Sequence, residues 1–215
     1  MQVAIFGTSY IKDEADAWLV RQWENLTRKL NPDAAIFLID SASPYPYRFK
    51  TKVIRLDGNI GHFSKGGGDG WGRAFITGLE LLSERYDWIV HIESDLILVR
   101  PVMESMIQPT LDAGMMIGAP IAEQYGFIET GLMCMSSDFI SKSGIVAQYE
   151  WQRTKNRDYP ENRIMQISKP YFQRLMLKGM RAEGNLIDPR AFDYLTHSSI
   201  SDMKAMILGA GLEIV

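Results

Sequence analysis

Two carboxylates one residue apart follow a strongly apolar, strand-like segment at residues 88–92. They belong to the triplet Glu93-Ser94-Asp95. Residues i and i+2 of an extended chain point to the same side, so both carboxylates can approach one ligand. Carboxylate oxygens suit Mg²⁺ or Mn²⁺, which proteins commonly share with substrate phosphates. The triplet therefore predicts a metal and phosphate site, although two solvated acids at a strand end would give the same pattern.

A glycine-rich segment, residues 58–72, precedes this triplet and leads into a helical pattern near residues 71–82. Glycine lets the backbone approach a phosphate closely, and a helix N-terminus favours anions. The segment lacks Gly-Lys-Ser/Thr and does not follow the first strand, so neither a Walker A loop nor a dinucleotide-binding loop fits. Arg73 could clamp a diphosphate. The alternatives are a flexible surface loop and an exposed helix residue.

The elements that must position these residues alternate between strands and helices. Strands are expected at residues 3–6, 35–39, 53–56, 88–92, 115–119 and 131–135. Asp13 or Asp16 is expected to cap a first helix whose apolar stripe runs from Leu19 to Leu30. Further helices are expected at 71–82, 138–151, 163–178 and 201–208, with Pro170 kinking or splitting the helix at 163–178. This alternation predicts an α/β fold with a mostly parallel sheet and helices on both faces. Ligands of such sheets bind beyond the carboxyl ends of the strands, so the chemistry is expected after Phe6, Ile39, Leu56 and Ile92.

The order Asn59-Ile-Gly61, Arg73-Ala74, Gly78 and Glu93-Ser-Asp95 resembles the GT-A glycosyltransferases, particularly their large inverting family. The resemblance covers roughly residues 2–135. It implies a Rossmann-like three-layer sandwich, a nucleotide diphosphate sugar donor, a glycan or other hydroxyl acceptor, and Mn²⁺ (or Mg²⁺). Residues 1–215 are expected to form one domain, with 1–100 binding the donor and 101–215 the acceptor. Glu93 departs from the family's Asp-x-Asp motif, which leaves Asp95 as the safer metal ligand.

The resemblance also assigns roles to individual residues. Asp95, Glu93 and a C-terminal histidine, His197, would hold the metal, although a lone histidine can be purely structural. Glu161 would join Asp95 as a catalytic residue, acting as the base that deprotonates the acceptor. A glutamate favoured by a helix dipole is the alternative. With such a base one displacement inverts the anomeric centre; without it, retention is possible. The donor would be bound by Thr8, Asp40, Gly61, Asp69, Arg73, Glu93 and Ser94.

Composition excludes some other classes of protein. The net charge of −3 argues against attraction to nucleic acid or anionic membranes. The single cysteine, Cys134, cannot form a disulfide within the chain, fits a reducing compartment and is expected in the core. With neither a signal peptide nor an apolar run of ~18 residues, a soluble cytoplasmic protein is expected.

Two rival functions remain at this stage. A sugar nucleotidyltransferase would have a glycine-rich loop with Arg and Lys after its first strand, whereas residues 6–10 contain one glycine and no basic residue. A non-catalytic module of the same fold, binding a nucleotide sugar or a carbohydrate, stays open because Glu93 replaces the family's aspartate.

Overall fold

A seven-stranded sheet forms the centre of the computed structural model, which describes residues 1–61, 67–122, 126–152, 158–181, 193–196 and 200–214. The strands run in the order β10-β6-β9-β4-β1-β2-β3. Strands β3, β2, β1 and β4 are mutually parallel, β10 is parallel to β6, and β9 is antiparallel to both β4 and β6. The predicted α/β fold with a mostly parallel sheet is therefore confirmed. The strand bounds are β1 Val3–Ser9, β2 Ala35–Asp40, β3 Lys52–Arg55, β4 Trp88–Ile92, β6 Ile117–Ala119, β9 Leu132–Ser136 and β10 Phe172–Arg174.

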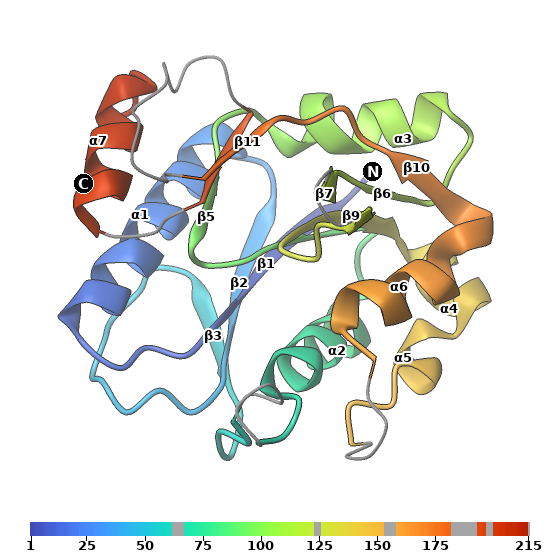
Figure 1. Cartoon of the computed structure of the whole chain (residues 1–215), viewed down its shortest axis with the longest axis horizontal. Helices are drawn as coiled ribbons and strands as arrows, with labels where there is room; N and C mark the ends of the chain where they lie inside the picture. Colours follow the sequence, from blue (N-terminus) through green and yellow to red (C-terminus); the bar gives the residue numbers. More distant parts are fainter. Residues whose placement is uncertain (62–66, 123–125, 153–157, 182–192, 197–199, 215) are drawn as a thin grey trace.

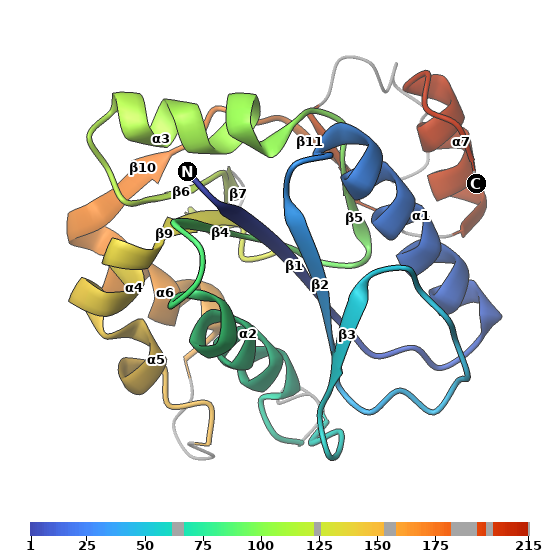
Figure 2. The same cartoon turned by 180° about the vertical axis from the view of Figure 1, so that it is seen from behind.

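Helices cover both faces of this sheet. Helices α1 (Glu14–Leu30) and α7 (Ile200–Gly209) lie on one side, and α2 (Gly70–Leu82), α4 (Ser137–Ser143), α5 (Ile145–Gln148) and α6 (Pro160–Ser168) lie on the other (Figures 1 and 2). Successive strand residues point to opposite faces. Thus Ile5 packs in the core formed with α1, and Phe6 packs in the core formed with α2. The result is the expected three-layer sandwich.

The first-half helices begin and end where polar capping residues allow it. The Asp13 carboxylate accepts a hydrogen bond of 3.0 Å from the Asp16 amide and caps α1, which stops at Asn31 before Pro32. The Asp69 carboxylate caps α2 in the same way, accepting from the Gly72 amide at 2.8 Å. These contacts fix where both helices begin.

The second half departs from the expected elements. The helix predicted at residues 163–178 is interrupted at Pro170 as expected, because proline lacks an N–H for a continuing helix. The helix predicted after this break is wrong, because the chain extends into β10. The predicted helix at 138–151 divides into α4 and α5 at Gly144, whose φ of 60° breaks the helical path. The helix predicted at 201–208 is confirmed as α7.

Several short elements were not predicted at all. They are a π-helical turn, Met103–Ile107, with α3 (Gln108–Asp112); a three-stranded sheet of β11 (Gly179–Arg181), β12 (Tyr194–Thr196) and β5 (Leu96–Leu98); and the pair β7 (Ile121–Ala122) and β8 (Phe127–Ile128). Two or three residues are too few to show a period, so only tertiary pairing defines such strands.

Cys134 lies in the core, as predicted. Its Sγ is 3.4 Å from the hydroxyl oxygen of Thr110, and burial raises the pKa of the thiol to about 12. None of the helices in the described ranges combines the length and apolar character needed to cross a membrane.

Candidate active site

A pocket of about 860 Å³ lies at the carboxyl ends of β1 and β4, where ligands of such sheets were expected. Its walls come from the β1–α1 loop, the segment that leads into α2, the end of β4 and the start of α6. Seven predicted site residues line it: Thr8, Gly61, Asp69, Glu93, Ser94, Asp95 and Glu161. Asp40 and Arg73 do not line it, and His197 lies outside the described residues.

The ends of β1 and β4 are joined by side-chain hydrogen bonds. The Ser94 hydroxyl donates to the Thr8 carbonyl oxygen at 2.8 Å, and Thr8 Oγ1 lies 3.4 Å from Nε2 of His91. The other ring nitrogen of His91 is 2.9 Å from the carbonyl oxygen of Thr130. Burial lowers the pKa of His91 to about 4, so the ring is neutral near pH 7. His91 therefore holds the strand ends in place as a core histidine.

Four carboxylates influence one another in this pocket region. Burial raises the pKa of Glu93 to about 8, and the negative charges of Asp95, Glu129 and Glu161 add to the effect, against a smaller opposing influence of the Trp71 indole. Glu93 is half-buried, whereas Asp95 is exposed. A bound cation would relieve this repulsion, so the charge balance fits a divalent metal.

Glu129 was not among the predicted site residues. Strands β4 and β9 pair so that Ile92 lies opposite Leu132, which brings Gly131 beside Glu93. A methyl group at position 131 would lie 3.0 Å from Glu93 Oε2 and 3.4 Å from Glu129 Oε1, so both carboxylates crowd against this glycine. Only knowledge that β9 runs antiparallel to β4 could have revealed this proximity from the sequence.

The described residues could supply part of a metal site. Asp95 and Glu93 offer the hard oxygen ligands that Mn²⁺ and Mg²⁺ prefer. Within the described ranges, no three His, Cys, Asp or Glu side chains are grouped closely enough to hold a metal ion. A cation here would therefore take further ligands from phosphate or water, as is usual for Mg²⁺ at phosphate sites.

Glu161 reaches the pocket from the first turn of α6, directly after Pro160 at the helix start. Its Oε2 atom is buried and has no hydrogen-bond partner among the described residues. An unsatisfied buried carboxylate oxygen is costly, which suggests that a ligand hydroxyl satisfies it.

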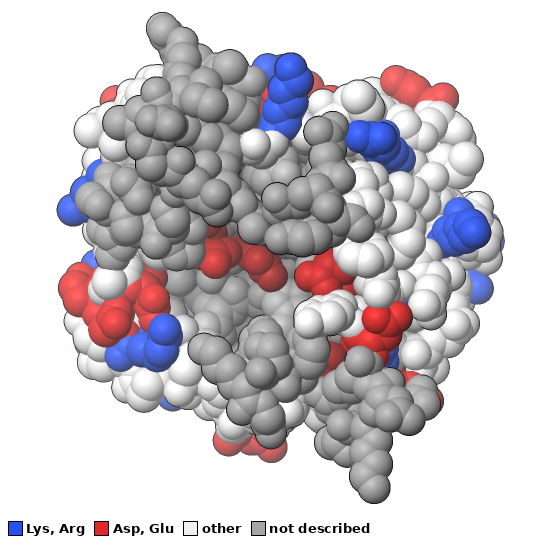
Figure 3. Space-filling model, viewed as in Figure 1, with Lys and Arg blue, Asp and Glu red and all other residues white. Residues whose placement is uncertain are grey.

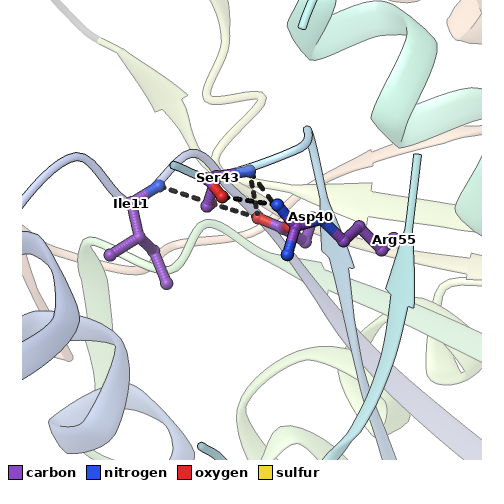
Figure 4. Close-up of polar contacts among 4 residues, drawn as sticks. All are labelled: Ile11, Asp40, Ser43 and Arg55. Atoms are coloured by element: carbon purple, nitrogen blue, oxygen red, sulfur yellow. Dashed lines mark hydrogen bonds and ion pairs between the residues drawn. The ribbon is translucent and has the colours of Figure 1, made fainter. Parts of the chain in front are cut away.

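The Asp40 side chain contacts Ser43 and Arg55 inside the protein (Figure 4). Its carboxylate, fully buried, accepts from the Ser43 amide at 3.2 Å and from the Ser43 hydroxyl, and lies 3.6 Å from Arg55 Nε. Ser43 Oγ in turn accepts from the Ile11 amide at 2.6 Å. Because Ile11 lines the pocket, Asp40 supports the pocket wall through Ser43.

Arg73 is likewise engaged away from the pocket. Its guanidinium donates to the Gly58 carbonyl oxygen at 2.9 Å, pairs with Asp57 and lies 5.5 Å from the centre of the Trp151 ring. A role for Arg73 or Asp40 in donor binding stays a prediction.

The pocket is acidic, and Lys12 is the one Lys or Arg among the described residues that line it. Its ammonium group lies 3.7 Å from Asp16. Figure 3 shows Asp and Glu surface on both sides of the hollow at the centre of the viewed face. An anionic donor would need positive charge here, and a divalent cation would supply it.

Comparisons with known proteins show similarity in structure alone. No family model and no curated protein matches the sequence. An active-site mutant of LgtC superposes with a TM-score of 0.58 at 12% identity, over 100% of this chain and 97% of the other. GlyE of Streptococcus pneumoniae superposes with a TM-score of 0.54 at 15% identity, over 81% of this chain and 45% of the GlyE chain.

A third neighbour is the mannosyltransferase PcManGT of Pyrobaculum calidifontis, solved in complex with GDP-Man and Mn²⁺. It gives a TM-score of 0.54 at 9% identity, over 81% of this chain and 54% of its own. This chain therefore spans about half the length of GlyE and PcManGT. Identities this low establish the fold alone, and that fold is the one found in the GT-A glycosyltransferases.

Proposed function

We propose that the protein transfers a sugar from a nucleotide diphosphate sugar to an acceptor hydroxyl, with the help of a divalent cation. The observation that carries this proposal is one pocket that holds Glu93 and Asp95 from the end of β4 and Glu161 from α6. The fold supports it, since one neighbour was solved with GDP-Man and Mn²⁺ and LgtC with donor and acceptor sugar analogues.

Asp95 and Glu93 are the residues that would hold Mn²⁺ or Mg²⁺. When bound, such an ion neutralises the charge that develops on a leaving diphosphate. Asp95 is exposed at the strand end and so is accessible to a cation. Glu93 would lose its proton on metal binding, since only the carboxylate form coordinates well.

Other described residues would bind and orient the two substrates. The pocket volume of about 860 Å³ falls within the range of small-molecule sites. Lys12 would attract the phosphates, and the 2.8 Å hydrogen bond from Ser94 to the Thr8 carbonyl oxygen would keep the ends of β1 and β4 together beneath the donor. Glu161 Oε2 would accept the proton of the acceptor hydroxyl as that oxygen attacks the anomeric carbon. Residues 1–100 would thus serve the donor and 101–215 the acceptor.

A thermal-shift screen of UDP, GDP and their sugar derivatives, with Mn²⁺ or with a chelator, tests whether the protein binds a nucleotide sugar with the help of a divalent cation. A ligand that binds only the native protein raises the melting temperature. We expect a rise with Mn²⁺ that Asp95→Asn loses and Glu161→Gln keeps, together with loss of sugar transfer in both variants. A shift without any transfer by the wild type would instead identify a binding module.

A further inference from the structure

The Asp69 carboxylate has partners inside the protein for both of its oxygens. Oδ1 accepts the capping hydrogen bond from the Gly72 amide at 2.8 Å. Oδ2 accepts from the Tyr149 hydroxyl at 3.0 Å and lies 3.7 Å from Nη1 of Arg163. The side chains of Asp69 and Arg163 are only 4% and 14% exposed, so this ion pair is largely shielded from water.

Tyr149 completes the cluster from the end of α5. Arg163 stacks on the Tyr149 ring, with its guanidinium carbon 4.0 Å from the ring centre. Burial and the Asp69 charge raise the pKa of the Tyr149 hydroxyl well above its usual range, while Arg163 opposes this shift. Tyr149 therefore remains a hydrogen-bond donor to Asp69 at any ordinary pH. We call Asp69, Tyr149 and Arg163 the Asp69 cluster.

Gly72 is what allows the cluster to be so compact. A Cβ atom at position 72 would overlap both Asp69 Oδ2 and the Tyr149 ring. This glycine of the glycine-rich segment thus serves a close contact between protein groups.

The cluster joins the start of α2 to α6, and α6 also carries Glu161. Arg163 lies two residues after Glu161, in the same short helix. This ion pair is largely buried, so it differs from a surface contact: removing one partner leaves the other as an uncompensated buried charge. We propose that Asp69 and Arg163 are positioning residues, which hold the first turn of α6 so that Glu161 faces the pocket. The catalytic consequence rests on the proposed function of Glu161.

Conservative substitutions separate this role from helix capping and from donor binding. Asp69→Asn keeps an N-cap side chain of comparable strength but removes the charge that faces Arg163. Arg163→Met removes the charge and the planar group, and Arg163→Lys keeps the charge alone. Lys142→Met, which breaks the exposed 3.1 Å pair with Asp138 on α4, is the matched control.

We expect Asp69→Asn and Arg163→Met to lower kcat roughly 10- to 100-fold, the loss that a slight misplacement of a catalytic group produces. The donor KM should stay within about threefold of the wild type. Arg163→Lys should recover part of kcat. The double variant Asp69→Asn/Arg163→Met should be no worse than the poorer single variant, because both changes break one interaction. Lys142→Met should match the wild type.

Amide hydrogen exchange supplies a readout that is independent of activity. Residues 160–168 should exchange faster in Asp69→Asn and Arg163→Lys than in the wild type, while α1 stays unchanged. Unchanged exchange in α6, or a raised donor KM with full kcat, would overturn the proposal. If the wild type transfers no sugar, the proposed function fails and exchange in α6 still decides the positioning role. If Arg163→Met does not fold, the other two single variants decide it.

Discussion

Asp40→Ala should destabilise the protein instead of removing a direct contact with a nucleobase. The side chain has no exposed surface and lies outside the pocket lining. Its carboxylate accepts two hydrogen bonds from Ser43, and Ser43 accepts from the Ile11 amide in the pocket wall. The substitution therefore loosens the β1–α1 loop by removing the contacts that hold Ser43 beneath Ile11.

The magnitude follows from these contacts. Hydrogen bonds to a charged group contribute about 1.5–3 kcal/mol each. The Arg55 pair adds at most about 1 kcal/mol, since the Arg55 side chain is 58% exposed. Unfolding free energy should then fall by about 3–7 kcal/mol. For a chain of this length each kcal/mol lowers the melting temperature by roughly 2–4 °C, which gives a decrease of roughly 6–28 °C.

Urea and thermal denaturation of Asp40→Ala and Arg55→Ala measure this loss, with the exposed Asp33→Ala as control. Arg55→Ala should lose about 1 kcal/mol or less. Calorimetry should show that Asp40→Ala lowers the affinities for UDP and GDP by similar factors, because a loosened loop does not distinguish between the two bases. Wild-type stability in Asp40→Ala, with affinity lost for one nucleotide only, would refute this reasoning and place Asp40 at the base.

Three further predictions concern Glu93, Cys134 and Gly72. In metal-free protein, unfolded Glu93 releases its proton near pH 4.5 and native Glu93 near pH 8, so stability falls as pH rises through that window. Glu93→Gln should therefore raise the melting temperature more at pH 8.5 than at pH 5, and an equal rise at both pH values would contradict the raised pKa of Glu93. The buried Cys134 thiol should react with a disulfide reagent far more slowly in the native protein than in urea at pH 8, and rapid native labelling would show that it is accessible. Gly72→Ala should lose more than about 2 kcal/mol of unfolding free energy through overpacking, whereas Gly58→Ala, whose added methyl group meets no atom within 4 Å, should lose little; equal losses would show that the crowding at position 72 relaxes easily.

Much of the first half could be predicted because its signals are local. The apolar run at β4 and the capping aspartate of α1 identify their elements without tertiary information. Parallel pairing then brings strand ends together, which is why Thr8 and the Glu93–Asp95 triplet line one pocket.

Contacts between distant parts of the chain could not be predicted from the sequence. The charged groups of Asp40 and Arg73 contact neighbouring loops, and their predicted role in donor binding stays a prediction. The proximity of Glu129 to Glu93 depends on how β9 pairs with β4. Strand β10 forms only because β6 offers a partner to a segment whose pattern looked helical.

Release of nucleoside diphosphate from a panel of sugar nucleotides, measured with Mn²⁺ and acceptor sugars, tests the proposed glycosyl transfer most directly. The wild type should release diphosphate and form a new glycoside with at least one donor. A chelator or Asp95→Asn should abolish both products, while circular dichroism shows that the variant remains folded. Full turnover in the chelator or in folded Asp95→Asn, or no glycoside from any donor, would contradict the proposed function.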